Sequence, residues 1–294
     1  MFLIIGEILI DELPGGGRPG GAPFNVARHL IRLGGMVSLV SRVGNDAAGT
    51  RLLSLARAAG LKTQSVQLDP IHQTGRVTVE LDHNGVPTYD ILRDVAYDHI
   101  DFHQAVAPDA WHKTIYFGSL IQRSEQGRKN LHDFLSREPA SANRLYDMNL
   151  RPGCDRVDVV IPSLEKTDVL KINDEELEVT GRLMGSSLQG DALVERLMDV
   201  FGIQAVALTK GPAGAALFMN GEYHERSASD VSPLKIIDTV GAGDAFTSVL
   251  AWGLEHGLPP AEILERADRL AGRVCCIPGA VPEDDEFYED IKTF

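Results

Sequence analysis

Apolar runs with strand character alternate with helical patterns along nearly the whole sequence, and few folds accommodate such an order. The strand-like runs Phe2–Ile5 and Val37–Val43 enclose a helical segment at Phe24–Leu33. This alternation predicts an α/β fold, in which helices cover both faces of a mostly parallel sheet. We expect further strands at Thr114–Phe117, Arg144–Met148, Val169–Ile172, Ala205–Thr209 and Ala215–Met219, and further helices at Ala47–Ala59, Gln126–Leu135, Leu188–Phe201 and Glu262–Cys275.

One segment departs from this alternation. Arg76–Leu81 and Thr88–Leu92 alternate with a period of two residues and flank Asp82–Gly85, in which Asn84 and Gly85 supply hairpin-turn chemistry. Two interpretations stay open. The hairpin projects over a pocket as a lid that excludes water, or it completes one edge of the sheet. Neither a repeat nor a low-complexity linker interrupts the 294 residues, so we expect a single domain over residues 1–294.

The composition is typical of a globular protein, with 44% hydrophobic and 24% charged residues. A formal net charge of −14 argues against nucleic acid and anionic membranes as partners. No apolar run reaches the roughly 18 residues of a membrane span, and the first ten residues lack the basic start of a signal peptide. Cys154, Cys275 and Cys276 show no metal-ligand spacing. We therefore expect a cytoplasmic protein.

The segment Asp238–Phe246 carries the strongest chemical signal. An apolar run, a strand or extended segment, leads into small residues at 241–243 and then into a helical pattern. Free amides at the start of a helix, with the positive end of its dipole behind them, hold anions well. A carboxylate at such a site should repel phosphate, so the presence of Asp244 needs an explanation. It is explained if Asp244 acts as a base that takes the proton from a hydroxyl attacking the phosphate. The segment therefore predicts phosphoryl transfer to an alcohol.

Other interpretations of this segment are weaker. Gly241 and Gly243 could begin a dinucleotide fingerprint, but Phe246 stands where that motif needs a small residue. The segment could also be an ordinary glycine-rich helix start, with Asp244 favouring the dipole. No Walker A motif occurs in the sequence, so a kinase of the P-loop type is excluded.

Polar residues follow two other expected strands. Asp11 lies just past the first strand, and the glycine-rich stretch Gly15–Gly21 leads from it to Asn25. Ligands bind beyond the carboxyl ends of strands in open α/β sheets, so Asp11 and Asn25 are placed to hold a polyol. The alternative is a surface loop before an ordinary helix start. Asp147 and Asn149 end another strand and are candidates for the same pocket.

Asn173 and Glu176 follow the strand Val169–Ile172 and admit two interpretations. They form a capping box at the start of a helix, or they position Mg²⁺ and its waters near a phosphate. His72, His99 and His103 match no metal-ligand spacing and receive no role.

Two of these segments together resemble the signatures of the ribokinase-like, PfkB-type carbohydrate kinases. Asp238–Phe246 looks like the second signature, and the stretch from Gly20 to Gly49 looks like the first. The resemblance runs nearly the whole chain in the right order. It implies a three-layer α/β/α sandwich with a mostly parallel central sheet and a small β lid, formed by segments at about 12–20 and 74–98. The connection from Asp11 to Gly20 is shorter than in the family, which implies that the lid lacks part of its first half.

The resemblance also implies roles for individual residues. Asp244 would be the general base, and the amides of Gly241, Ala242 and Gly243 would form the anion hole. Asp11, Gly21 and Asn25 match sugar-binding positions. Asn173 and Glu176 match a motif that organises Mg²⁺ through water. The positions matching the nucleotide side are Thr209, Gly211, Gly214 and Gly279.

Asp238 and the carbonyls of Val240 and Gly279 match a monovalent-cation site in family members that use K⁺. Glu283 stands where such members often carry Ser. The implied ligands are therefore ATP and Mg²⁺, with K⁺ as an open question. The implied assembly is a monomer or a homodimer.

Among the family branches, the fructokinases are the most similar. Gly6–Asp11, Gly21–Pro23 and the stretch Asp147–Pro152 carry this similarity, although Cys154 and Asp155 stand where a Leu-Trp pair is usual. The resemblance implies phosphorylation of fructose or a related ketose. A 2-keto-3-deoxygluconate kinase is the alternative, and Arg76, Arg93 or Arg151 would then meet the substrate carboxylate. A sugar or nucleotide sensor without activity is a third reading.

Overall fold

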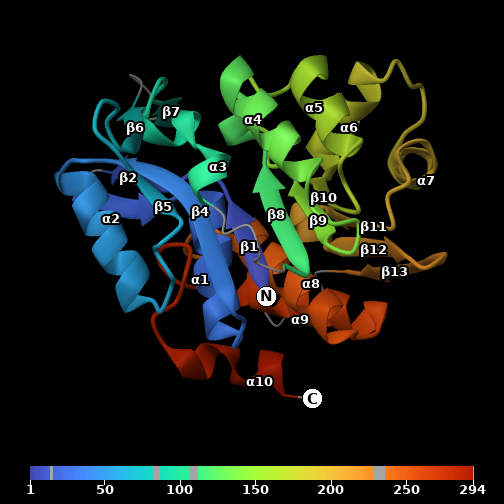
Figure 1. Ribbon diagram of the computed structural model, residues 1–294. Helices are drawn as coiled ribbons and strands as arrows, with labels where there is room; N and C mark the ends of the chain where they lie inside the picture. The colour runs from blue at the N-terminus through green and yellow to red at the C-terminus, as the bar shows by residue number, and fades with distance from the viewer. Residues whose placement is uncertain (14–15, 82–86, 106–111, 228–235, 294) are drawn as a thin grey trace.

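A nine-stranded sheet forms the centre of the computed structural model, which describes residues 1–13, 16–81, 87–105, 112–227 and 236–293 (Figure 1). The strand order is β13-β12-β11-β10-β9-β8-β1-β4-β5. The strands from β11 to β5 pair in parallel, and β12 and β13 extend the sheet as an antiparallel hairpin. Its strands are β1 (Phe2–Ile5), β4 (Val37–Gly44), β5 (Val66–Asp69), β8 (Thr114–Gly118), β9 (Asn143–Asp147), β10 (Val169–Asn173), β11 (Ala205–Thr209), β12 (Ala215–Met219) and β13 (Glu222–Arg226).

Side chains that alternate along the inner strands enter two separate cores. In β1, Phe2 and Ile4 belong to one buried cluster, whereas Leu3 and Ile5 belong to the other. A strand buried on both faces reads as a continuous apolar run, as this one does. Helices on both faces therefore make three layers, as the sequence predicted.

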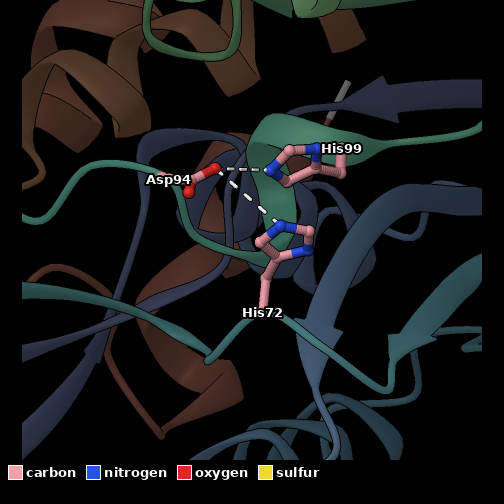
Figure 2. Close-up of side chains that lie close together, drawn as sticks. All are labelled: His72, Asp94 and His99. Atoms are coloured by element: carbon pink, nitrogen blue, oxygen red, sulfur yellow. Dashed lines mark hydrogen bonds and ion pairs between the residues drawn. The ribbon is translucent and has the colours of Figure 1, made fainter.

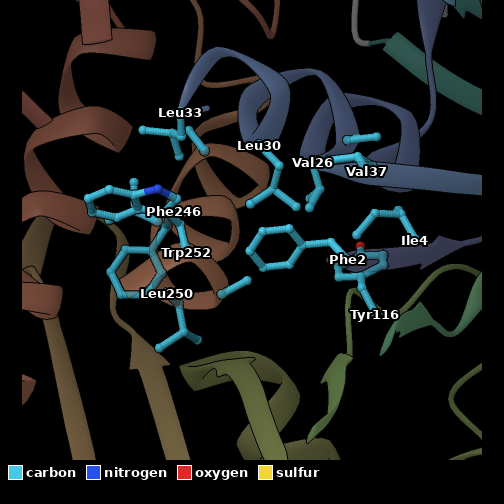
Figure 3. Close-up of a cluster of buried hydrophobic side chains, with 14 of the residues drawn as sticks. Phe2, Ile4, Val26, Leu30, Leu33, Val37, Tyr116, Phe246, Leu250 and Trp252 are labelled. Atoms are coloured by element: carbon cyan, nitrogen blue, oxygen red, sulfur yellow. The ribbon is translucent and has the colours of Figure 1, made fainter. Parts of the chain in front are cut away.

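The first core lies between the sheet and the helices α1, α2, α8 and α9. Figure 3 shows Leu30 of α1 and Trp252 of α8 converging with Phe2 and Tyr116 of the sheet. These helices are α1 (Ala22–Arg32), α2 (Ala47–Ala58), α8 (Ala242–His256) and α9 (Pro260–Val274). The C-terminal residues Tyr288 and Ile291 pack into the same core.

The second core lies under the helices of the opposite face. Leu131 of α4, Val160 of α5 and Leu193 of α7 pack against the other side chains of the sheet. The elements on this face or at its borders are α3 (Phe102–Ala105), α4 (Glu125–Leu135), α5 (Val157–Leu164), α6 (Asp174–Leu183), α7 (Gly190–Phe201), η1 (Ala96–His99) and η2 (Leu120–Gln122). Short helices elsewhere are η3 (Gly211–Ala213), η5 (Asp285–Tyr288) and α10 (Glu289–Lys292). No helix of the described chain is long and apolar enough to cross a membrane.

A second, four-stranded sheet has the order β3-β2-β6-β7, and we call it the small sheet. Its strands are β2 (Leu9–Leu13), β3 (Gly16–Gly20), β6 (Gly75–Leu81) and β7 (Pro87–Ile91). The predicted hairpin is confirmed within one residue, and it pairs with β2, so it does not complete an edge of the central sheet. Its turn, Asp82–Gly85, lies outside the described residues. The short connection forms both β2 and β3, and the expectation that the lid lacks part of its first half stays a prediction.

Candidate active site

The carboxyl ends of β9, β10 and β11 lie along one edge of the central sheet. In the parallel register, Asp147 is the partner of Lys171, and Asn173 is the partner of Thr209. The fold thus gathers three predicted site residues, Asp147, Asn173 and Thr209, at the edge where open α/β sheets bind ligands.

The turn before α8 is shaped by Gly241. Its φ of 84° is left-handed, and a Cβ there would lie 2.4 Å from Cβ of Ala280. Only glycine fits such a position without strain. The α-helical hydrogen bonding begins with Ala245 N donating to Gly241 O, and Ala242 N donates to Thr239 O at 3.3 Å. Gly243 and Asp244 thus occupy the first turn, where amides lack an acceptor within the helix. Residues 236–240 form no strand, so the approach to the turn is extended or irregular.

Asp244 lies in the first turn of α8 and faces α1. Its Oδ2 accepts a hydrogen bond of 2.8 Å from Nδ2 of Asn25. Burial raises the pKa of Asp244 to about 6, and the nearby charge of Asp147 raises it too, whereas Asn25, Lys171 and Arg151 lower it. A carboxylate with such a pKa is ionised at neutral pH and still basic enough to take a proton. Oδ1 of Asn25 is buried without a protein partner, so it could accept a hydrogen bond from a ligand hydroxyl.

Glu7 is a charged residue of the site that sequence reasoning missed. It is 5% exposed, and burial raises its pKa to about 7, against the charge of Arg151 and a hydrogen bond from its own backbone. A Cβ on Gly21 would lie 2.5 Å from the Glu7 carbonyl oxygen, so Gly21 lets the start of α1 approach this segment. Asp244 contributes to the raised pKa of Glu7, which places the two carboxyl groups in one electrostatic environment.

Lys171 is the second residue that sequence reasoning missed. Its Nζ lies 3.3 Å from Oδ1 of Asp147, and Thr247 donates a hydrogen bond of 2.9 Å to Oδ2 of the same carboxylate. Burial opposes the charge, but Asp147 and Glu176 raise the pKa of Lys171, so it remains a cation. Nζ would be 3.3 Å from a Cβ placed on Gly243, which puts this buried cation directly beneath the helix start. Oδ1 of Asp147 has no hydrogen-bond partner besides this ion pair, and the role of Asp147 toward a sugar stays a prediction.

Asn173 and Glu176 form the predicted capping box at the start of α6. Glu176 N donates to Oδ1 of Asn173 at 2.8 Å, and Asn173 N donates to Oε2 of Glu176 at 3.0 Å. Oε1 of Glu176 accepts the amide of Leu150 at 2.8 Å. Burial raises the pKa of Glu176, against the charge of Lys171. The magnesium role stays a prediction. Oδ1 of Asn173 and both carboxylate oxygens of Glu176 already accept one hydrogen bond each, so only their second lone pairs are free to accept one from water.

The side chain of Asp11 is placed by β2. Its Oδ2 would be 2.1 Å from a Cβ on Gly20, so glycine on the paired strand gives the carboxylate room. Burial raises the pKa of Asp11, and Arg151 opposes this. The neighbours Ile10 and Glu12 line a cavity of about 410 Å³ between the small sheet and α2. Since side chains alternate along a strand, Asp11 faces away from that cavity.

The remaining predicted residues lie in turns at or near this edge. Asn149 has a left-handed φ of 36°, and its carbonyl oxygen accepts from Ser119 Oγ at 3.0 Å. Gly211, the first residue of η3, and Gly214, the residue after η3, have left-handed φ values of 52° and 103°. The glycine turn with Gly279 has a φ of 86°.

His29 of α1 holds the turn that contains Gly279 in place. Its Nε2 lies 3.0 Å from the carbonyl oxygen of Ala280, and its Nδ1 lies 2.7 Å from the hydroxyl of Tyr288. Since Ala280 also touches Gly241, this buried histidine connects the C-terminal segment to the start of α8. Sequence reasoning missed His29 because a lone histidine in a helix carries no motif.

The segment around Asp238, predicted as a cation site, is held by hydrogen bonds to the carbonyl oxygen of Cys275. Cys275 O accepts the amides of Ile237 and Asp238 at 2.8 and 3.2 Å, and Oδ1 of Asp238 accepts the amide of Val240 at 3.0 Å. The roles of Asp238 and Val240 toward K⁺ stay predictions.

Comparisons with known proteins identify the family of the chain. A family model described as pfkB family carbohydrate kinase matches residues 16–285. A putative sugar kinase of Pyrococcus horikoshii is 30% identical over 268 residues, covering 86% of this chain and 82% of that protein. A fructokinase of Klebsiella pneumoniae is 29% identical over 270 residues, covering 87% of this chain and 85% of that protein.

Solved structures share the fold. The Pyrococcus horikoshii sugar kinase in complex with ATP has a TM-score of 0.82 at 27% identity, covering 98% of this chain and 97% of that one. A fructokinase of Xylella fastidiosa with bound ATP has a TM-score of 0.83 at 22% identity, covering 95% and 93%. The family match spans most of the chain, and this protein therefore belongs to the pfkB family of carbohydrate kinases.

Proposed function

We propose that the protein transfers the γ-phosphoryl group of ATP to a hydroxyl of fructose or a related ketose. The observation that carries this proposal is the position of Asp244, which is ionised at neutral pH, in the first turn of α8. The names of the relatives support the substrate class, since several are fructokinases. A structure of the Vibrio cholerae fructokinase with fructose and ADP shares the fold at a TM-score of 0.81.

The residues have distinct tasks in this proposal. Asp244 takes the proton from the attacking hydroxyl, while Asn25 holds the carboxylate in position. Asp11 and the free oxygen of Asn25 bind sugar hydroxyls. The amides of Gly241–Gly243, with Lys171 beneath them, stabilise the charge on the transferred phosphoryl group.

Nucleotide and cations would occupy the remaining predicted positions. Thr209, Gly211, Gly214 and Gly279 lie where ATP would bind. Mg²⁺ would supply charge neutralisation on the phosphates, held through water by Asn173 and Glu176. Asp238 and the carbonyls of Val240 and Gly279 are the candidate positions for K⁺, and omission of K⁺ from the assay tests them.

A 2-keto-3-deoxygluconate kinase is the second candidate, and the position of Arg151 favours keeping it. The charge of Arg151 lowers the pKa values of Glu7, Asp11 and Asp244, so this cation acts on the carboxyl groups of the proposed pocket. Arg76 instead pairs with Glu12, at 2.5 Å, beside the separate cavity. Arg151 would form an ion pair with the carboxylate of such a substrate.

The test is ADP release from Mg·ATP with a sugar panel of fructose, ribose, 2-keto-3-deoxygluconate, glucose, inosine and fructose 6-phosphate. We expect turnover with fructose, and an Asp244→Ala variant that loses about 10²–10⁴-fold while still folding. Turnover only with 2-keto-3-deoxygluconate would assign the second candidate. Sugar binding without any product would indicate a sensor, and normal turnover of Asp244→Ala would disprove the mechanism.

A further inference from the structure

Three side chains of metal-ligand type meet at the base of the small sheet. His72 precedes β6, Asp94 follows β7, and His99 ends η1. Oδ1 of Asp94 lies 2.9 Å from Nε2 of His99 and 3.8 Å from Nε2 of His72. One ligand atom from each residue lies within 4.8 Å of the others, and Figure 2 shows both imidazoles joined to the same carboxylate. The spacing of these residues in the sequence predicted no site, because the hairpin of β6 and β7 separates the two histidines.

A buried carboxylate orients His72. Oδ2 of Asp69 lies 3.0 Å from Nδ1 of His72 and 2.7 Å from Nε of Arg42, and the Asp69 side chain is 0% exposed. The other carboxylate oxygen, Oδ1 of Asp69, accepts the amides of Ile71 and His72, both at 2.8 Å. Because Asp69 also pairs with Arg42, its carboxylate is placed to accept hydrogen bonds, so Nδ1 of His72 donates to it and Nε2 is the ring nitrogen left for a metal ion. A carboxylate behind a histidine in this way is the usual outer shell of a metal site.

The lone pair of His72 then faces another acceptor. Nε2 and Oδ1 of Asp94 approach to 3.8 Å, and a cation between them removes the repulsion. The His72 and His99 rings stack with centroids 3.7 Å apart and planes 15° apart. Asp94 is held in the left-handed region with a φ of 55°, and its side chain is 79% exposed, which leaves room for water.

We propose that His72, Asp94 and His99 bind one divalent transition metal ion of the zinc class, with water completing its coordination. Two imidazoles and one carboxylate suit zinc, cobalt or nickel, whereas magnesium and calcium prefer oxygen ligands alone. His72 lies just before β6, Asp94 lies just after β7, and His99 belongs to η1, which lies outside the small sheet. The ion would therefore link the segments before and after the hairpin β6–β7 to η1.

The test is a calorimetric titration of Zn²⁺ into the whole protein, with excess Mg²⁺ and without sugar or nucleotide. Cys275 and Cys276 are replaced by Ser throughout, because adjacent thiols also bind zinc. We expect one saturable site that Asp94→Asn and His99→Ala abolish. The matched control, His103→Ala, removes a histidine outside the cluster and should leave binding unchanged. Asp69→Asn should weaken binding by about 10–100-fold.

A second readout separates binding from loss of folding. Zn²⁺ should raise the melting temperature of the parent protein by mass action but not that of Asp94→Asn, whose melting temperature in a chelator should match the parent. Unchanged binding in Asp94→Asn and His99→Ala, or no saturable binding at all, would overturn the proposal.

Discussion

Nδ2 of Asn25 donates a 2.8 Å hydrogen bond to Oδ2 of Asp244, across 219 residues of sequence. The bond joins the first turn of α1 to the first turn of α8. Burial favours the neutral acid, whereas this hydrogen bond favours the charged carboxylate. The resulting pKa of Asp244 is about 6. A helix packing contact thereby sets both the position and the basicity of the proposed base.

The first prediction concerns pH. Protonated Asp244 cannot take a proton from the sugar, so kcat/KM should fall as the pH decreases below about 6. The measurement is kcat/KM for the active sugar from pH 5 to pH 9. Glu7 also titrates nearby, with a pKa of about 7, so its protonation is the alternative cause of such a fall. The variant Glu7→Gln removes this group and should still show kcat/KM falling near pH 6, which we call the acid limb of the profile. A profile that stays flat down to pH 5 would contradict the role of Asp244.

Removal of the Asn25 side-chain amide should shift the pH below which kcat/KM falls. In Asn25→Ala the carboxylate loses a donor, so the pKa of Asp244 should rise and the acid limb should move to higher pH. A hydrogen bond to a charged group contributes about 1.5–3 kcal/mol, so kcat/KM should fall by about 10–100-fold at neutral pH. An unshifted acid limb with lower kcat/KM would mean that Asn25 serves only the sugar.

The ion pair of Lys171 and Asp147 gives a third prediction. Both side chains are buried, with Nζ 3.3 Å from Oδ1, so Lys171→Met leaves an unpaired buried carboxylate. Breaking a buried pair in this way costs about 3–5 kcal/mol of the free energy of unfolding. Denaturant unfolding of the variant measures the loss.

The double variant Lys171→Met/Asp147→Asn separates stability from catalysis. It removes both charges, so much of the stability should return, while kcat stays low because no cation lies beneath Gly243. Recovery of kcat together with stability would show that Lys171 has only a structural role.

The fold was largely predictable because most inner strands are predominantly apolar runs. Phe2–Ile5 was predicted with the bounds that β1 has, and Ala205–Thr209 with those of β11. The strands β2, β3, β5 and β13 were missed. Of these, β3 is a glycine-rich run and β13 is a mostly exposed edge strand of polar residues. Neither carries the apolar signal by which strands are recognised.

The site was predictable where residues belong to a local motif. Asn173 and Glu176 stand three residues apart, and their capping box could be read directly from that spacing. Glu7, Lys171 and His29 could not be found in this way, since their importance arises from contacts with distant segments. For Lys171 the one signal was a charged residue inside an otherwise apolar strand.

The fourth prediction concerns Gly241. Gly241→Ala places a Cβ 2.4 Å from that of Ala280, in addition to the strain of a left-handed φ. Strain alone costs about 1–2 kcal/mol, and the clash should displace the turn that carries the proposed anion site. We expect kcat/KM to fall by more than the loss of stability explains. The control is Gly257→Ala, where φ is 67° and no atom lies within 4 Å, so only the strain should appear.

The last prediction concerns the stability of the fold at acidic pH. His29 is fully buried, and burial lowers its pKa to about 3, against about 6.5 in the unfolded chain. Between these values the unfolded state binds more protons, so the contribution of His29 to stability decreases as the pH falls from about 6.5 toward 3. The slope is at most about 1.4 kcal/mol per pH unit.

Asp244 and Glu7 act in the opposite direction. Their pKa values are raised in the fold, to about 6 and about 7, so the folded state binds the extra proton and their contribution decreases as the pH rises from about 4 to 7. The free energy of unfolding of the wild type alone therefore mixes both effects. The difference between wild type and His29→Gln isolates the histidine, because the carboxyl groups are common to both. This difference should shrink as the pH falls below about 6.5, and a difference independent of pH would show that His29 is not held neutral by burial.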